Sequence, residues 1–389
     1  MINRLKTYIT FLLCLVMLNT NAGNAFKKYV VDLYGHLISI NFNADFFSSR
    51  DKILDELSIT NLLKAFEEQD NDSLIKQLDK YSAQFKMDDI AYLLMLNKVA
   101  DEVYDEESTD LKTLFKYGLL KEKGYDVILG YGTHSLTLYG YLNLKVLNVL
   151  YIQKNNKTYT DLSFKQNAEP LTEREFTAGN SSGGGRSFNI NEHSPPLFNA
   201  KKSKRSYHFE YDAYQYFVNS SINQSLVEYY HDLPDIEFNS IYLNYGLSAG
   251  TRAELVKQLQ EYTKGMYTAK AVDFILCFTQ YAFDYKKDAD AIGKEKFSFP
   301  EEVLANPYSD CEDKSVLFAY LVKEVLGIHS IALFYKSQEH LNVAVPSTAK
   351  NDINFTYNSV GYTVCEPSGL GLRPGEFAND VRTASIIQW

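Results

Sequence analysis

The sequence has few of the residues that build disulfide scaffolds and metal sites. Its 389 residues include only 4 cysteines and 7 histidines, and no two cysteines have the C-x-x-C spacing. Small exported domains that depend on disulfides carry many paired cysteines, and structural zinc sites need closely spaced Cys and His ligands. The glycines at 183–185 lie in a polar loop without the strand and helix of a phosphate-binding loop. We therefore expect no metal, nucleotide or other cofactor.

Positive charge is also in short supply. The chain has 39 Lys and Arg residues against 49 Asp and Glu residues, which gives a formal net charge of −10. Nucleic acids and anionic lipid surfaces are recognised through clustered positive charge. The charge balance therefore argues against both classes of partner.

Long apolar runs are absent after the first 25 residues. Residues 1–25 have the pattern of a secretory signal, because Arg4 and Lys6 precede an apolar segment at 8–18 and small residues follow it. That segment is too short to span a bilayer comfortably. An uncleaved membrane anchor is the alternative, and a lipoprotein is disfavoured because no small residue precedes Cys14. We expect an exported protein, periplasmic or secreted, with no membrane span after signal removal.

Periodicity divides the rest of the chain into helical and strand-rich stretches. Apolar residues recur at three-and-four spacing over 50–122, and short apolar strands follow. Residues 164–200 are polar and loop-rich, whereas 207–218 alternates aromatic and polar residues like a half-buried strand. Helices return from about 250 and strands from His329. The sequence predicts an α+β fold with units at 26–165, 166–245 (a β-rich middle segment) and 246–389.

The order of helices followed by strands occurs twice, which indicates an internal repeat. Shifting the chain by 203 residues aligns LFKYGLLKEKGYDVI at 114–128 with LFAYLVKEVLGIHSI at 317–331. Far downstream, the same shift places Tyr159-Thr160 on Tyr362-Thr363. We infer an ancient duplication that produced a first and a second copy of one fold.

One cysteine lies in the segment YSDCEDKSVLFAYL, at 308–321. Ser309 or Asp310 is a good helix N-cap, and Ser309 with Glu312 forms an S-x-x-E capping box. An apolar helical face follows, so Cys311 falls in the first turn. The positive end of the helix dipole stabilises a thiolate there, while the adjacent acidic side chains raise the thiol pKa. The cysteine is either a small buried residue or a nucleophile, and a nucleophile needs a partner base.

A base and an orienting acid follow in the chain. His340 begins the strand HLNVAV, and Glu366 ends the strand GYTVCEP. A catalytic cysteine needs a base that accepts the thiol proton and a third group that orients the imidazole. Cys311, His340 and Glu366 therefore form a candidate triad. Gln280, at the end of an earlier helix, is a candidate donor to an oxyanion, and a solvent-facing glutamine is the alternative.

These residues resemble bacterial transglutaminase-like proteins of the papain-like superfold. The resemblance covers about residues 250–375 and rests on FPEEVLANPYSDCEDKSVLFAYLVKEVLGI, EHLNVAV and YTVCEPSG. It implies a catalytic domain in which Cys311 is the nucleophile, His340 the base and Glu366 the orienting acid. The chain departs from the family pattern in two ways: Glu replaces the more usual Asp, and Gln338-Glu339 replaces the Pro-Gly turn often found before the histidine.

The same resemblance makes the first copy a degenerate transglutaminase-like domain. The 203-residue shift replaces all three reactive positions and places Ser108, Thr137 and Ser163 there. His134 lies near the expected histidine position, but this copy contains no cysteine. We expect the first copy to pack or bind and the second to react.

The remaining cysteines have simpler interpretations. Cys277 lies in an apolar helix and is expected in the core. Cys365 should face the core if Glu366 faces the site, because neighbouring strand residues point to opposite faces. A Cys311–Cys365 disulfide would silence the enzyme, and zinc held by Cys311, Cys365 and His340 is a weaker alternative.

We expect a thiol-dependent acyl-transfer enzyme that acts on a peptide or protein, with the cell envelope as one source of substrate. Hydrolysis, as in a cysteine protease or amidase, is favoured over cross-linking because water is abundant and nothing marks an amine site. The alternative is a non-catalytic envelope binding or scaffold protein that keeps the fold. The 30 tyrosines and 24 phenylalanines fit either a β core or a surface for sugars or peptides.

Overall fold

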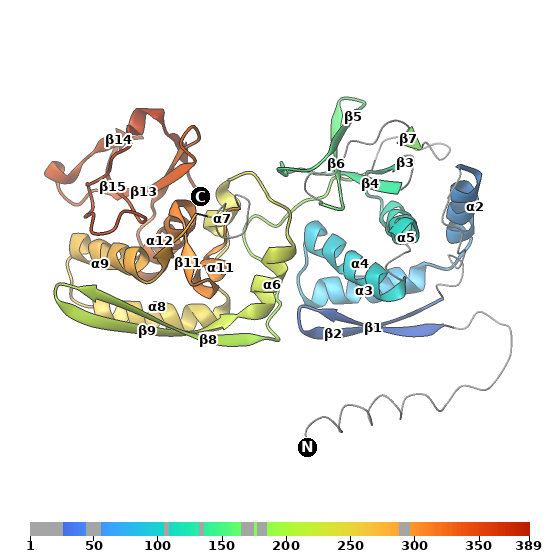
Figure 1. Ribbon diagram of the computed structural model, residues 1–389, viewed down its shortest axis with the longest axis horizontal. Coiled ribbons are helices and arrows are strands. Elements are labelled where there is room, and N and C mark those ends of the chain that lie inside the picture. The colour runs from blue at the N-terminus through green and yellow to red at the C-terminus, as the bar shows by residue number, and fades with distance from the viewer. Residues whose placement is uncertain are drawn as a thin grey trace, which may run out of the picture.

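A computed structural model describes residues 26–43, 56–104, 109–131, 136–164, 175–176, 185–287 and 296–389. The signal-like residues 1–25 lie outside these ranges. The described chain is mixed α+β, and Figure 1 shows two units side by side, each with a sheet above its helices and a β-hairpin below them. Every helix in these ranges is too short or too polar to cross a bilayer.

The first copy begins with a β-hairpin, continues with helices and ends with a sheet. Its described elements are β1 (Lys27–Leu33), β2 (His36–Phe42), α2 (Glu56–Glu67), α3 (Asp72–Gln84), α4 (Asp89–Val103), α5 (Thr109–Glu122), β3 (Val127–Tyr131), β4 (Leu136–Tyr141), β5 (Tyr151–Lys154), β6 (Lys157–Asp161) and β7 (Glu175–Phe176).

The second copy follows the same plan with additional short elements. It consists of β8 (Lys202–Tyr211), β9 (Tyr214–Asn223), α6 (Gln224–Asp232), α7 (Ser240–Asn244), α8 (Ala249–Thr263), α9 (Thr268–Tyr281), β10 (Asp284–Tyr285), α11 (Pro300–Ala305), β11 (Tyr308–Ser309), α12 (Cys311–Leu326), β12 (Ile331–Tyr335), β13 (His340–Pro346), η2 (Lys350–Asp352), β14 (Phe355–Tyr357), β15 (Val360–Cys365), η3 (Val381–Thr383) and β16 (Ser385–Ile387).

The two five-stranded sheets have the same topology. The strand order is β5-β6-β4-β3-β7 in the first copy and β14-β15-β13-β12-β16 in the second. All neighbouring strands in both sheets are antiparallel. Corresponding strands therefore occupy corresponding places, which supports the duplication inferred from the 203-residue repeat.

The predicted middle segment, 166–245, is divided between the two copies by its contacts. Strand β7 pairs with β3, and Arg186 and Phe188 form bridges to Tyr125 and Leu142 of the first copy. The β8–β9 hairpin instead packs on α8 and α9 of the second copy, as β1 and β2 pack on α4 and α3 of the first. The hairpin is amphipathic, so it needs helices to cover its apolar face.

The strand faces refine the alignment of the copies. Leu129 and Leu138 pair in the first copy and pack into the main core, as Ala332 and Val343 do in the second. The connection from Ala332 to Val343 is two residues longer than the connection from Leu129 to Leu138. His340 lies within this longer connection, where it pairs with the last residue of β12.

The longer connection corrects the predicted correspondence of His340 with Thr137. Thr137 precedes a core-facing residue of β4 as Asn342 does in β13, so Thr137 corresponds to Asn342. The first-copy counterpart of His340 lies outside the described residues, as does Ser108. The uniform 203-residue shift is wrong in this strand because the second copy has two more residues before it. An insertion of two residues keeps every side chain of the strand on its own face, so the fold tolerates it.

The predicted correspondence of Glu366 with Ser163 agrees with the strand faces. Leu162 and Cys365 both pack into the main core beside the central strand of their sheet. The residues that follow them, Ser163 and Glu366, are therefore equivalent. Ser163 is exposed, whereas Glu366 is buried.

One apolar core runs through both copies. Aromatic rings link the copies, because Phe198 contacts Tyr34 at 4.7 Å and Tyr229 at 5.5 Å between ring centroids. All of the largest fully buried side chains in the described residues are tyrosines or phenylalanines. Most of the aromatic content of the described residues therefore serves the core, and a few exposed tyrosines and phenylalanines are the exceptions.

Candidate active site

Helix α12 begins at Cys311 and is capped by Asp310. The Asp310 carboxylate accepts a hydrogen bond from the backbone N–H of Asp313 at 3.3 Å, and Gly327 ends the helix with a left-handed φ of 69°. The predicted capping box is wrong, because Ser309 ends β11 and its hydroxyl has no hydrogen-bond partner within the described ranges. Cys311 therefore occupies the first turn, where backbone N–H groups lack intrahelical partners.

Asp313 and Ser315, which follow the cysteine in α12, anchor the start of the helix to neighbouring segments. Asp313 accepts a hydrogen bond from the backbone N–H of Ser298 at 3.0 Å. Ser315 donates to the backbone carbonyl of Leu341 at 2.5 Å and so ties α12 to β13. The first turn of α12 is thereby held against the strand that carries His340.

Lys314 is fully buried next to the thiol-bearing turn. Its ammonium group donates to the backbone carbonyls of Gln280 and Phe283, each at 2.9 Å, and so caps the end of α9. Burial lowers the pKa of Lys314 to about 8, and the charge of Asp284 opposes that shift. Hydrogen bonds from the S-D-C-E-D-K-S segment thus tie the start of α12 to the end of α9 and to β13.

The thiol of Cys311 faces an acid rather than a base. Its Sγ donates to Glu312 Oε2 at 2.7 Å and lies 3.7 Å from the backbone carbonyl of Glu339, the residue before His340. Only 8% of Cys311 is exposed. Burial raises the thiol pKa, and the carboxylates of Glu312 and Asp310 raise it further. The thiol is therefore protonated in this arrangement.

The Glu312 carboxylate interacts with both the Cys311 thiol and the His340 imidazole. Burial raises its pKa to about 7 and the charge of Asp310 adds to this, whereas the hydrogen bond from Cys311 and the charge of His340 lower it. The motif pattern assigned this side chain to a helix cap. Because Asp310 takes the cap, Glu312 is free to contact the sulfur.

The structure brings His340 and Glu366 together. The ring Nε2 of His340 lies 2.7 Å from Glu366 Oε2, and the hydroxyl of Ser368 donates to Glu366 Oε1 at 2.6 Å. Burial lowers the pKa of His340, but the hydrogen bond and charge of Glu366, with the charge of Glu312, outweigh it and raise the pKa overall. With Nε2 engaged by Glu366, Nδ1 is the ring nitrogen left to accept a proton.

The thiol and the imidazole are adjacent in the fold but are not hydrogen-bonded to each other within the described residues. The carbonyl of Glu339 places the start of β13 next to the sulfur of Cys311. Because the S–H group of Cys311 is donated to Glu312, that hydrogen bond has to break before His340 can take the thiol proton.

Gln280 does not face an oxyanion site. Its Nε2 donates to the backbone carbonyls of Glu366 at 3.1 Å and Leu372 at 3.0 Å, and the residue is 2% exposed. Both amide hydrogens are thus used to hold the segment that carries Glu366. The arrangement differs from the predicted oxyanion role and from the solvent-facing alternative, and it makes Gln280 a positioning residue.

Tyr285 lies near the thiol, and no pattern in the sequence points to it. It pairs with Ser309 in the short β10–β11 ladder. Burial, followed by the charges of Cys311 and Asp310, raises its pKa to about 12, yet the residue is 47% exposed. A two-residue strand has no periodicity to detect, so this neighbour of the sulfur emerges only from the fold.

The three described cysteines are free thiols. Cys365 packs into the main core while Glu366 bonds to His340, which is the alternation predicted for a strand. Cys277 is half-buried rather than in the core, and its Sγ donates to the carbonyl of Glu210 at 3.2 Å. Across the described residues, no cluster of three or more His, Cys, Asp or Glu side chains could hold a metal ion.

No protein-family model and no curated protein matches this chain. The functional assignment therefore rests on the chemistry of the site.

Proposed function

We propose that the protein is an acyl-transfer enzyme of transglutaminase-like fold that hydrolyses an amide or peptide bond through a thiol. The observation that carries the proposal is the pair of His340 and Glu366, 2.7 Å apart, at the start of the strand held against the helix that begins with Cys311. A cysteine in a helix first turn and an imidazole oriented by an acid are the parts that thiol catalysis requires.

The proposed reaction begins when Cys311 turns away from Glu312 and gives its proton to Nδ1 of His340. The thiolate attacks the substrate carbonyl carbon and forms a C–S bond. His340 then donates its proton to the nitrogen as the C–N bond breaks, which leaves a thioester. Water gives a proton to His340 and attacks the thioester carbon, and the departing sulfur takes that proton back as the acid is released. Glu366 holds the ring and stabilises the imidazolium in both steps.

The proposed location is outside the cytoplasm, periplasmic or secreted, on the sequence pattern of residues 1–25. Peptides or proteins of the cell envelope are the proposed substrates.

A non-catalytic binding or scaffold role is the second candidate, and the burial of the sulfur favours it. Cys311 is 8% exposed, and its hydrogen bond goes to Glu312. The two candidates differ in one physical property, which is whether His340 stabilises a thiolate at Cys311.

The deciding experiment measures how fast iodoacetamide alkylates Cys311, followed at the Cys311 peptide by mass spectrometry from about pH 5 to 10. Because the thiolate is the nucleophile, the enzyme proposal predicts that His340→Ala lowers the rate near neutral pH about tenfold or more. The matched control is His329→Ala, which removes an exposed histidine of the same copy and should leave the rate unchanged.

Identical rate profiles in the wild type and His340→Ala would exclude the ion pair. If both also titrate at or above about 8.5, the value of an unperturbed cysteine, the scaffold role would stand in its place.

A further inference from the structure

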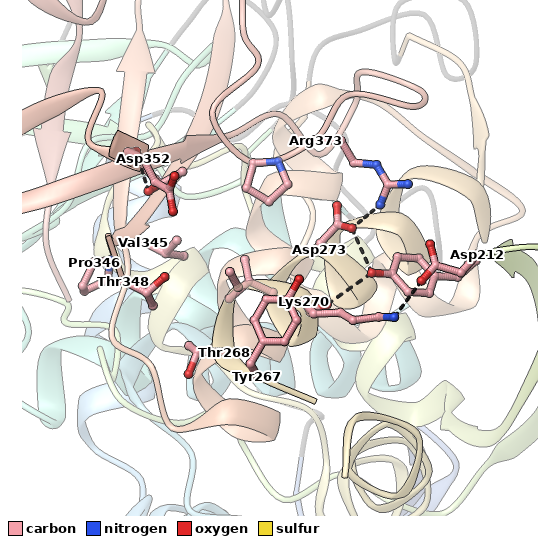
Figure 2. A pocket seen from close by; sticks show the side chains of 15 residues that line it. Asp212, Tyr267, Thr268, Lys270, Asp273, Val345, Pro346, Thr348, Asp352 and Arg373 are labelled. Atoms are coloured by element: carbon pink, nitrogen blue, oxygen red, sulfur yellow. Dashed lines mark hydrogen bonds and ion pairs between the residues drawn. The ribbon is translucent and has the colours of Figure 1, made fainter. Parts of the chain in front are cut away.

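A cleft of about 450 Å³ lies at the opposite end of α9 from the thiol. Tyr267 stands directly before α9 and Gln280 near its end, so the helix separates the cleft from the thiol by roughly 20 Å. Figure 2 shows the first turn of α9 facing Val345 and Pro346 of β13 across the cleft. The volume is at the lower end of the range for small-molecule sites.

The charged groups on one side of the cleft are already paired with one another. Lys270 contacts Asp212 at 2.8 Å, and Arg373 contacts Asp273. The hydroxyl of Tyr211 also donates to Asp273, at 2.9 Å. In Figure 2 these side chains lie together on one side. They offer hydrogen-bond donors and acceptors but little net charge, so they do not select an ionic ligand.

The opposite side carries a single acid, Asp352. In the described part of the chain its carboxylate has no hydrogen bond or ion pair. The hydroxyl of Thr363 donates to the backbone carbonyl of Asp352 and not to its carboxylate. Thr348 lies on the same side in Figure 2 and adds a hydroxyl. An exposed, unpaired carboxylate repels anions and accepts hydrogen bonds from hydroxyl groups.

An exposed aromatic ring borders the cleft. Tyr267 is 71% exposed, which makes it the most exposed aromatic side chain in the described ranges. Tyr214, at the tip of the neighbouring β8–β9 hairpin, is 70% exposed. An exposed ring beside a polar cleft suits a ligand with one flat apolar face.

We propose that this cleft binds an uncharged saccharide of one or two rings. The ring of Tyr267 packs against the apolar face of the sugar, and the Asp352 carboxylate accepts hydrogen bonds from its hydroxyls. The Lys270 and Arg373 pairs supply donors from the other side. The charge of Asp352 disfavours an anionic ligand. A cationic ligand would contact the Asp352 carboxylate alone, whereas a neutral polyhydroxylated ligand can form hydrogen bonds on both sides of the cleft. The site is independent of the thiol chemistry proposed above.

The test is saturation-transfer NMR on the full chain with the methyl glycosides of glucose, galactose, mannose and N-acetylglucosamine, followed by titration of the strongest binder. Tyr267→Ala should weaken binding about fivefold, which is the scale of one aromatic contact. Asp352→Asn should weaken it about threefold, which is the scale of one hydrogen bond. Tyr267→Phe keeps the ring and should bind like the wild type, as should Tyr151→Ala, which removes an exposed ring of the first copy.

Two outcomes of the glycoside measurements overturn the proposal. One is that no glycoside of the panel binds at tens of millimolar, and the other is that both Tyr267→Ala and Asp352→Asn bind as tightly as the wild type. A third outcome replaces the ligand class. If Nα-acetyl-lysine amide binds more tightly than every glycoside and Asp352→Asn abolishes that binding, the cleft is a cation site.

Discussion

The two copies of the fold place different residues at corresponding strand ends of their two sheets. In the second copy, a part-buried His340–Glu366 pair lies there beside a helix that begins with cysteine. In the first copy, the counterpart of Glu366 is the exposed Ser163. Both sheets keep the same strand order. The fold therefore does not depend on the His340–Glu366 pair.

The contrast extends to the helix that follows the reactive position. Buried Lys314 in α12 corresponds to buried Leu111 in α5. Leu111 packs into the apolar core, whereas Lys314 satisfies two backbone carbonyls at the end of α9. At this position the second copy uses polar contacts where the first uses apolar packing.

The largest expected effect comes from Glu366→Ser, which gives the second copy the residue of the first. Burial lowers the His340 pKa and Glu366 contributes most to raising it, so the variant loses both the charge and the orientation of the ring. We expect hydrolysis of p-nitrophenyl acetate through Cys311 to fall about a thousandfold.

Ser163→Glu is the matched change in the first copy and should leave that rate unchanged, because this copy contains no cysteine. A rate that survives Glu366→Ser would show that the acid does not orient a catalytic base.

Glu312→Gln is expected to show a pH-dependent gain in stability. The folded-state pKa of Glu312, about 7, exceeds its ordinary value of 4.5. The stability that its proton contributes is therefore fully present below pH 4.5 and is lost as the pH rises through 7. Over that window the wild type should lose about 3 kcal/mol relative to the variant in urea unfolding.

The same variant should alkylate faster at Cys311 near neutral pH, because the carboxylate that raises the thiol pKa is gone. A stability difference that is flat from about pH 5 to 8 would show that Glu312 is not buried against the sulfur as described.

Lys314→Leu makes α12 resemble α5 and should destabilise the chain by about 2 kcal/mol. Two buried carbonyls lose their donor, at about 1–3 kcal/mol each, and relief from burying an ammonium group offsets part of that cost. Guanidinium unfolding of the variant measures the difference. The reciprocal Leu111→Lys should also destabilise, since it buries a charge without those carbonyls. An unchanged unfolding free energy for Lys314→Leu would place the lysine in solvent.

The smallest effect is expected for Cys365→Ala, at the position that is Leu162 in the first copy. Removing one buried sulfur should cost about 1 kcal/mol of unfolding free energy. The alkylation rate of Cys311 should stay within about twofold, because Cys365 is a free thiol in the core on the face opposite Glu366. A large change in that rate would revive the disulfide alternative.

The α+β class, the repeat and the first-turn position of Cys311 were predictable from sequence. The class and the helix start depend on apolar periodicity and on residues that cap helices, which are local signals, whereas the repeat depends on residue matches at one long shift. The correspondence of Glu366 with Ser163 was likewise accessible, because the connection from Leu138 to Leu162 is two residues longer than the connection from Val343 to Cys365, which cancels the insertion before β13 and restores the 203-residue shift. The His340 correspondence was not, since a two-residue insertion leaves no trace in the strand pattern.

The partners of the buried polar groups were out of reach of sequence patterns. Lys314 and Gln280 bond to backbone groups of segments more than thirty residues away, and only the packed fold brings these together. The S-x-x-E motif pointed to Ser309 as the N-cap with Glu312 completing a capping box, but Asp310, the other candidate one position on, takes the cap. Local motifs do not resolve such competition between neighbouring side chains.

The longer connection between β12 and β13 bears on how a protein like this can change over generations. Side chains alternate along a strand with a period of two, so adding or deleting two codons leaves every remaining side chain on its own face. A change of one codon would move the following side chains to the opposite face of the sheet. A single two-codon deletion in this connection could remove the position of His340 and spare the core. The histidine position at this strand end can therefore be gained or lost in one genetic event, without passing through an unfolded ancestor.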